Sequence, residues 1–240
     1  MPANLPPSAT SVLDAFTWHA LTTSLVALGE GGALARRFLP HIAGFAALRE
    51  PTTAAWGELA DLAGAGATMI LSGAAPHEPP DGWVTFGIAA GFQMLLEELA
   101  GVTDADPALG PVTMVPLDVA DVPAIMELIS LANPGPFRDG SIEFGGYVGA
   151  FVGGRLAAMA GRLLQTPDFV EVGAVCTHPS FQGRGLGALI THRIASTIMA
   201  EGRTPVLHVA EGNVRAQRVY RRLGFVTRCS IPFGLYRSPA

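Results

Sequence analysis

Apolar and polar positions alternate regularly after residue 110, and this rhythm predicts strands and helices in turn. Short runs with every second position apolar indicate strands, whereas apolar residues three and four positions apart indicate helices. Asp118 or Asp121 is placed to cap the first helix and Asn213 the last, and Gly202 and Gly224 are placed to end helices. The predicted strands cover residues 112–115, 147–152, 155–164, 169–177, 206–209 and a segment from 225, with helices after residues 118–121, 186 and 213.

The first 110 residues carry a weaker pattern. Thr52 or Thr53 is placed to cap a helix, and residues 67–72 and 83–89 are predicted strands. Residues 92–99 fit either a strand or a helix. The order of elements indicates an α/β protein.

A segment rich in turn-forming residues, 101–111, is interpreted as a linker. The charge balance changes sign across it. Residues 1–110 carry three arginines against eleven acidic residues, a net charge of −8, and residues 111–240 carry twelve arginines against nine, a net charge of +3. We therefore expect two domains, residues 1–110 and residues 111–240. The basic second half suits a small polyanionic ligand, because arginine forks match phosphate oxygens, but it is too weakly basic to indicate nucleic acid.

The composition indicates a globular protein with a sizeable core, since 49% of residues are apolar and 15% are charged. The two cysteines, Cys176 and Cys229, form no metal or redox motif, so no metal is expected and a reducing cytoplasm is the natural location. No signal peptide pattern opens the sequence. The most apolar window, residues 83–96, is shorter than the roughly 20 residues that span a bilayer. No membrane association is expected.

One stretch carries recognisable chemistry, where the strand at 169–177 leads through glycines 183, 185 and 187 into a helix. Glycines let the backbone approach a ligand closely, and the N–H groups at a helix N-terminus favour anions. The stretch therefore predicts a cradle for a pyrophosphate.

Other pyrophosphate cradles fit less well. A P-loop requires a lysine, and all 15 basic residues of this chain are arginine. A dinucleotide-binding fingerprint is formally matched by Gly183, Gly185 and Ala188, with Glu211 after the next strand. In that fold the first glycine follows the strand almost directly, whereas residues 177–182 intervene here.

Two blocks of residues resemble the GNAT superfamily of N-acetyltransferases. The first is its signature Gln/Arg-x-x-Gly-x-Gly/Ala, and the second is an asparagine, alanine and tyrosine followed by Leu-Gly-Phe. These blocks are matched by Gln182, Gly185 and Gly187, and then by Asn213, Ala216, Tyr220, Leu223, Gly224 and Phe225. The resemblance implies a GNAT fold, which is a mixed, twisted sheet with flanking helices. It also implies a tandem arrangement, with residues 1–110 as a degenerate GNAT-like or capping domain before a catalytic domain.

The resemblance further implies acetyl-CoA as the co-substrate. The strand residues would pair with its pantetheine arm, the backbone of the glycine-rich stretch would hold its pyrophosphate, and Arg184 and Asn213 would add contacts. The implied set is Val175, Cys176, Thr177, Gln182, Gly183, Arg184, Gly185, Leu186, Gly187, Ala188 and Asn213.

The implied catalytic acid is Tyr220, which would protonate the departing thiolate. Glu171 and His208 are the candidates for the base; by the period-two rule, Glu171 shares a face of its strand with Gly173 and Val175. His178 is expected to make a turn contact. Cys176 is expected to be a buried, aliphatic-like residue, because members of the superfamily transfer the acetyl group directly in a ternary complex.

These expectations describe transfer of an acetyl group to a primary amine, either a small molecule or a peptide. The first domain would wall one side of the cleft, and its negative charge would attract a cationic amine. Two alternatives remain open, a non-catalytic acetyl-CoA-binding regulatory protein and a dinucleotide-binding oxidoreductase. The sequence leaves the oligomeric state open.

Overall fold

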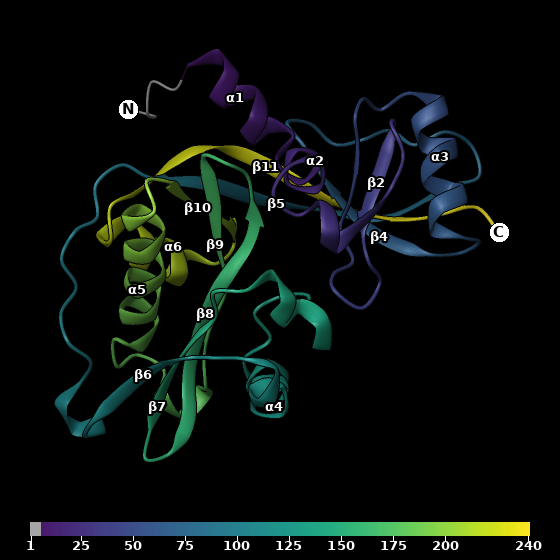
Figure 1. Cartoon of the computed structure of the whole chain (residues 1–240). Coiled ribbons are helices and arrows are strands. Elements are labelled where there is room, and N and C mark those ends of the chain that lie inside the picture. Colours follow the sequence, from purple (N-terminus) through teal and green to yellow (C-terminus); the bar gives the residue numbers. More distant parts are fainter. Residues whose placement is uncertain (1–5) are drawn as a thin grey trace.

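A computed structural model describes residues 6–240 as two sheets with helices around them (Figure 1). The helices are α1 (Pro7–Asp14), α2 (Phe16–Thr22), α3 (Thr53–Ala63), α4 (Val122–Ala132), α5 (Leu186–Ala200) and α6 (Val214–Arg222). The strands are β1 (Gly29–Gly31), β2 (Ala35–Phe38), β3 (Ala46–Leu48), β4 (Thr68–Ser72), β5 (Val84–Leu96), β6 (Val112–Pro116), β7 (Val148–Val152), β8 (Arg155–Gln165), β9 (Phe169–Thr177), β10 (Thr204–Ala210) and β11 (Phe225–Arg237). Short 3-10 turns include η4 (Asp139–Phe144) and η5 (Pro179–Phe181).

The larger sheet contains eight strands in the order β4-β11-β5-β10-β9-β8-β7-β6. Its neighbours are antiparallel except β9 and β10, which run parallel. Helices cover both faces, with α5 and α6 against one and α1, α2 and α4 against the other. The expected mixed α/β sheet with flanking helices is confirmed.

Strand β5 comes from the first half of the chain but lies between β10 and β11, which come from the second. Its residues 91–95 pair with β10, and its residues 84–96 pair with β11. Figure 1 shows β5 and β11 running side by side between the two parts of the molecule. The division expected near residue 110 therefore does not coincide with a break in the sheet.

The interpretation of this region as two separate segments was wrong. The strand predicted at 83–89 and the ambiguous segment at 92–99 form one continuous strand of 13 residues. Gly91 does not break it, because this glycine is paired on both sides, with Ala210 of β10 and with Ile231 of β11.

A smaller sheet, β1-β2-β3, packs with α3 around Trp56. Thr52 caps α3 as expected, its hydroxyl accepting a hydrogen bond from the Ala55 amide at 3.2 Å. The Trp56 ring lies 5.5 Å from the ring of Tyr236 in β11, so the end of the chain completes this core. Figure 1 shows α3, β2 and β4 gathered near the C-terminus.

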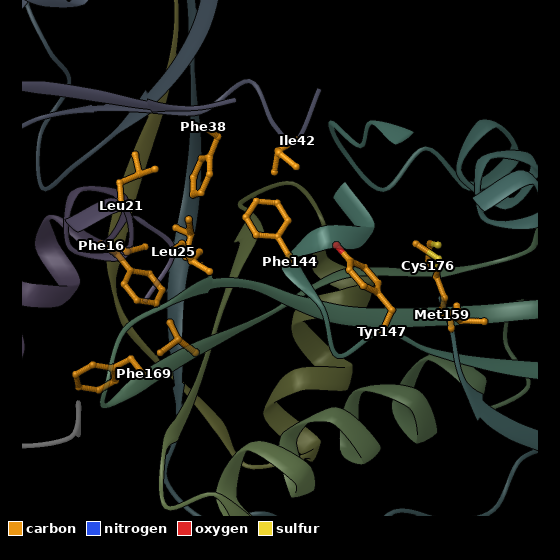
Figure 2. Packing of buried hydrophobic residues seen from close by; sticks show 14 of the residues in the cluster. Phe16, Leu21, Leu25, Phe38, Ile42, Phe144, Tyr147, Met159, Phe169 and Cys176 are labelled. Atoms are coloured by element: carbon orange, nitrogen blue, oxygen red, sulfur yellow. The ribbon is translucent and has the colours of Figure 1, made fainter. Parts of the chain in front are cut away.

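A second core joins the two halves of the chain. Figure 2 shows Phe16 and Leu21 of α2 and Phe38 of β2 facing Phe144 of η4 and Phe169 of β9. The rings of Phe38 and Phe144 meet edge-on at 5.1 Å. The N-terminal helices α1 and α2, which the sequence pattern did not predict, are therefore part of the main core rather than a separate layer.

The local predictions for the second half are largely confirmed. Strand β9 covers residues 169–177 as expected, and α4 ends before Asn133, which takes a left-handed conformation. The Asn213 side chain accepts a hydrogen bond from the Ala216 amide at 3.1 Å and so caps α6. Among residues 6–240, no helix is both long and apolar enough to cross a membrane.

Candidate active site

The parallel strands β9 and β10 separate after a short paired stretch. Their pairing runs from Phe169 with Thr204 to Glu171 with Val206. Beyond it, residues 172–177 of β9 keep their partner β8 on one side and face a cleft on the other. The cleft has a volume of about 1030 Å³. The open edge, which includes Val175, Cys176 and Thr177, leaves backbone groups unpaired on the cleft side.

The glycine-rich stretch turns the chain from this strand into α5. Gly183 and Gly185 have φ angles of 82° and 88°, the left-handed region that favours glycine, and Gly185 is the N-cap of the 15-residue helix. Gly183, Gly185, Leu186, Gly187 and Ala188 all line the cleft. The free N–H groups of the first helical turn therefore lie at the cleft wall, where they favour an anion.

Gln182 bridges the end of β9 and helix α6. Its amide nitrogen donates to the Thr177 carbonyl at 3.3 Å, and its carbonyl oxygen accepts from the Arg215 guanidinium at 3.1 Å. Gln182 therefore holds the shape of the loop and also lines the cleft.

The positive charge of the cleft comes from α6 rather than from Arg184. Arg215, Arg218 and Arg222 line the cleft, and none of the described residues that line it is Asp or Glu. Arg184 is not among the lining residues, although its carbonyl accepts a hydrogen bond from the Asp106 amide at 3.0 Å. These three arginines were not predicted as site residues from the sequence. Their spacing of three and four positions on one helix was the available signal.

The alternation of side chains along β9 changes at Ala174. This residue has a φ of 51°, which is rare for a residue other than glycine. Val170 and Val172 pack towards α5 and α6, and Val175 joins them, whereas Ala174 and Cys176 pack on the opposite side. The prediction that Glu171 and Val175 share a face was therefore wrong, because the irregular backbone at Ala174 shifts the alternation by one residue.

Tyr220 of α6 lines the cleft close to Cys176 of β9. Burial raises the pKa of Tyr220 to about 12, and the neighbouring thiol contributes in the same direction. Its hydroxyl makes no hydrogen bond within residues 6–240. The phenol is therefore protonated at neutral pH and free to donate.

The Cys176 thiol is a poor nucleophile in this setting. Burial raises its pKa to about 12, despite a backbone hydrogen bond at Met159 that acts in the opposite direction. A thiol attacks as its thiolate, and this thiol stays protonated near neutral pH. Cys176 thus has the buried, aliphatic-like character expected for it.

Glu171 and His208, the two candidates for the base, are in direct contact. The His208 Nδ1 atom lies 2.8 Å from Glu171 Oε1, and each side chain is about 10% exposed. The Leu164 amide donates to Glu171 Oε2 at 3.3 Å. His208 lines the cleft, whereas Glu171 is buried behind the lining, as the last residue of β9 paired with β10. The pair therefore sits where the two strands part.

His178 makes the turn contact expected of it, because its Nδ1 accepts a hydrogen bond from the Ser180 amide at 3.1 Å. Asn213 both caps α6 and lines the cleft. Gly101, Val102 and Thr103 of the predicted linker also line the cleft, so the first half of the chain contributes to its wall.

Comparisons with known proteins agree with this geometry. A solved structure described as an acetyltransferase of the GNAT family, from Novosphingobium aromaticivorans, is 31% identical to this chain. It matches over 95% of this chain and 99% of its own length, with a TM-score of 0.83. The chain belongs to the GNAT superfamily. It is an acyltransferase, and the family expected from the Gln182 and Asn213 blocks is confirmed.

Other comparisons agree over shorter stretches or at lower identity. A family model described as FR47-like protein matches residues 147–231. Mycothiol acetyltransferases of two Mycobacterium strains are 38% identical over 77 residues, which is 30% of this chain and 26% of their own length. The chain thus matches about a quarter of the length of these curated relatives. An N-acetyltransferase of Kribbella flavida, at 17% identity and a TM-score of 0.64, shares the fold.

Proposed function

We propose that this GNAT protein transfers an acetyl group from acetyl-CoA to a primary amine, by direct attack within a ternary complex. The observation that carries the proposal is the open edge of β9 between a glycine cradle and a protonated Tyr220. Acetyl-CoA supplies an acyl thioester whose carbonyl carbon is the electrophile. The remaining steps are assigned to residues of this chain.

The donor fits the cleft by charge and by shape. Gly183 and Gly185 adopt backbone conformations that a side chain would strain, and they open the start of α5 to a pyrophosphate. Arg215, Arg218 and Arg222 supply positive charge around it. The unpaired N–H groups of residues 172–177 are available to hold an extended arm and to polarise an acyl carbonyl.

The amine proton is assigned to the Glu171–His208 pair. As the nitrogen–carbon bond forms, the amine must lose a proton, either directly or through a water molecule. The pair is placed for this step at the point where β9 and β10 part. The carbon–sulfur bond then breaks, and Tyr220 donates its proton to the sulfur atom.

The acceptor is proposed as an amine class only. The name of the mycothiol acetyltransferases is not carried over, because the match covers 26% of their length. The acidic first half, with a net charge of −8, favours the approach of a cationic amine. We further propose that residues 1–110 act as a wall of this site and are a degenerate relative of the catalytic part.

The test is release of free thiol from acetyl-CoA in the presence of a panel of primary amines. Wild-type protein is expected to release thiol with at least one amine, and Glu171→Gln to release it about 100-fold more slowly, the scale of general base catalysis. Binding of acetyl-CoA without amine-dependent thiol release would instead support the non-catalytic alternative. A thermal shift with NAD and none with CoA would support the oxidoreductase.

A further inference from the structure

We propose that Gln93, a residue of the first half of the chain, fixes the protonation of His208 and thereby leaves Glu171 as the proton acceptor of the pair. Gln93 lies in β5 opposite His208 in β10, and it is completely buried. Its amide nitrogen lies 3.1 Å from His208 Nε2. The inference rests on the proposed function of the Glu171–His208 pair.

The orientation of the Gln93 amide is set by two neighbours with opposite requirements. The Arg228 guanidinium, which can only donate, lies 2.7 Å from the Gln93 side-chain oxygen. The Leu13 carbonyl, which can only accept, lies 3.1 Å from the Gln93 side-chain nitrogen. Rotating the amide by half a turn would place two donors together and two acceptors together. The nitrogen must therefore face His208.

This orientation determines the tautomer of His208. The Gln93 NH₂ group presents a donor to Nε2, so Nε2 must accept and carry no proton. The single proton of the neutral ring is then on Nδ1, where it is donated to Glu171 Oε1 at 2.8 Å. Both ring nitrogens are occupied, and a proton added at Nε2 would oppose the Gln93 donor.

Glu171 keeps acceptor capacity that His208 lacks. A carboxylate offers about four lone-pair positions. The described residues occupy two of them, through His208 Nδ1 and the Leu164 amide. Because Glu171 does not itself line the cleft, the amine proton reaches its carboxylate through a water molecule, and His208 is a positioning residue that orients the carboxylate.

Helix α1 fixes the position of Arg228, and through it the orientation of the Gln93 amide. Arg228 forms an ion pair with Asp14 of α1 and donates to the Thr10 carbonyl at 3.3 Å. Asp14, Arg228, Gln93, His208 and Glu171 thus form one continuous series of polar contacts from α1 to the cleft. The first half of the chain contributes to the chemistry by this route.

The direct test is nitrogen NMR of histidine-labelled wild-type protein at neutral pH. The chain has six histidines, and a His208→Gln variant identifies the signals of interest. We expect a protonated Nδ1 and an unprotonated Nε2 at His208. A protonated Nε2 in the wild-type protein, as the opposite tautomer or as the imidazolium, overturns the proposal whatever the Gln93 variants show.

The functional test is Gln93→Glu, which keeps the shape and the Arg228 contact but offers His208 an acceptor. The same oxygen faces the Leu13 carbonyl, so Gln93→Met, which removes the donor without adding an acceptor, is measured beside it and is also expected to lower kcat. We expect the NMR signals to show a protonated Nε2, and kcat to fall at least tenfold, while the KM for acetyl-CoA changes by less than about threefold. The matched control is Ser230→Ala, which removes a 3.3 Å hydrogen bond to the Gly91 carbonyl beside the network. This control should keep the wild-type tautomer and kcat.

The role of Gln93 and the proposed acetyltransferase function can fail independently. If Gln93→Glu leaves the tautomer or kcat unchanged, Gln93 does not act as proposed. If the wild-type protein acetylates no amine but shows the expected tautomer, the proposed function is wrong, and the assignment of the His208 tautomer to Gln93 is still supported. A greater loss of kcat in His208→Gln than in Glu171→Gln would assign the proton to His208 and contradict the inference.

Discussion

The backbone of Gly224 lies against the carbonyl of Glu98, so that a Cβ atom at position 224 would be 1.8 Å from that oxygen. Gly224 also has a φ of 97°, and its carbonyl accepts a hydrogen bond from the Glu97 amide at 3.3 Å. The turn between α6 and β11 thus fits closely over the end of β5. Only glycine satisfies both the backbone conformation and the contact.

Gly224→Ala is therefore expected to lower the free energy of unfolding by more than about 2 kcal/mol, the sum of left-handed strain and a steric clash. Urea denaturation measures this change. The control is Gly57→Ala in α3, where a Cβ would meet no atom within 4 Å. That substitution should raise stability by about 0.5–1 kcal/mol through helix propensity. Equal effects at the two positions would contradict the close fit at Gly224.

Tyr220→Phe tests the proposed acid. Among the described residues no hydrogen bond acts on the hydroxyl, so its removal should leave the fold intact. We expect kcat to fall by about 100-fold and the KM for acetyl-CoA to stay within about twofold. Steady-state kinetics with a good amine acceptor provides both values. Wild-type turnover in this variant would remove Tyr220 from the mechanism.

Cys176→Ala distinguishes direct transfer from an acyl-cysteine route. Because burial raises the pKa of the thiol to about 12, we expect the variant to keep kcat within about threefold of wild type. Cys229→Ala removes the other free cysteine, which lies outside the cleft on β11; because its sulfur accepts a hydrogen bond from Arg228 at 3.3 Å, a small loss of kcat there reports on that contact rather than on acyl transfer. Loss of all activity in Cys176→Ala alone, with an acetylated Cys176 detected by mass spectrometry in the wild type, would instead establish a covalent intermediate.

Arg218→Ala tests the charge that α6 brings to the cleft. We expect the KM for acetyl-CoA to rise by about threefold to tenfold, and the increase to shrink at high salt. Arg193→Ala on α5 is the control, because Arg193 is exposed and does not line the cleft. Repeating the measurement with a donor that lacks the 3′-phosphate shows whether that group is the one contacted. Identical KM values for the two variants would argue against a role for Arg218.

Glu201→Gln gives a prediction for acid stability. Hydrogen bonds from Arg162 and Arg203 lower the pKa of Glu201 from 4.5 to about 2. Because the folded state favours the charged carboxylate, the stabilisation is present above about pH 5 and is lost as the pH falls through the folded value near 2. The side chain is 39% exposed, so solvent screening limits the effect to less than about 1 kcal/mol.

The measurement for Glu201 is the free energy of unfolding of both proteins at pH 7 and near pH 2.5. The variant should be less stable than the wild type at pH 7, and the difference should shrink at the lower pH. Glu211→Gln is the control, because Glu211 forms no ion pair within residues 6–240. A difference that is the same at both pH values would exclude the proposed contribution.

Local signals made the second half of the chain predictable. Asn213 and Gly224 mark the two ends of α6, and the glycines from 183 to 187 mark the start of α5. Each depends on a short stretch of sequence. The base candidates were identified in the same way, but their contact was not, because Glu171 and His208 meet only when β9 and β10 pair.

Long-range relationships account for most of what the sequence left open. Gln93 is a single polar residue in an apolar strand, and its role depends on Arg228 and Leu13, which are distant in the sequence. The left-handed conformation of Ala174 carries no residue signal, since glycine or asparagine would be the usual indication. The place of β5 in the sheet likewise results from pairing with strands that follow more than 100 residues later.

The position of β5 between β10 and β11 also affects the order in which the sheet can form. β5 is synthesised before either of its neighbours, and β10 and β11 follow it by more than 100 residues. Contacts between such distant segments carry a large loop-closure entropy and slow the search for the native state. In a chain synthesised in order, one edge of β5 would stay unpaired until β10 emerges, and its other edge until β11 follows. We therefore expect the strand that carries Gln93 to be prone to aggregation during synthesis, before β10 and β11 can cover its edges.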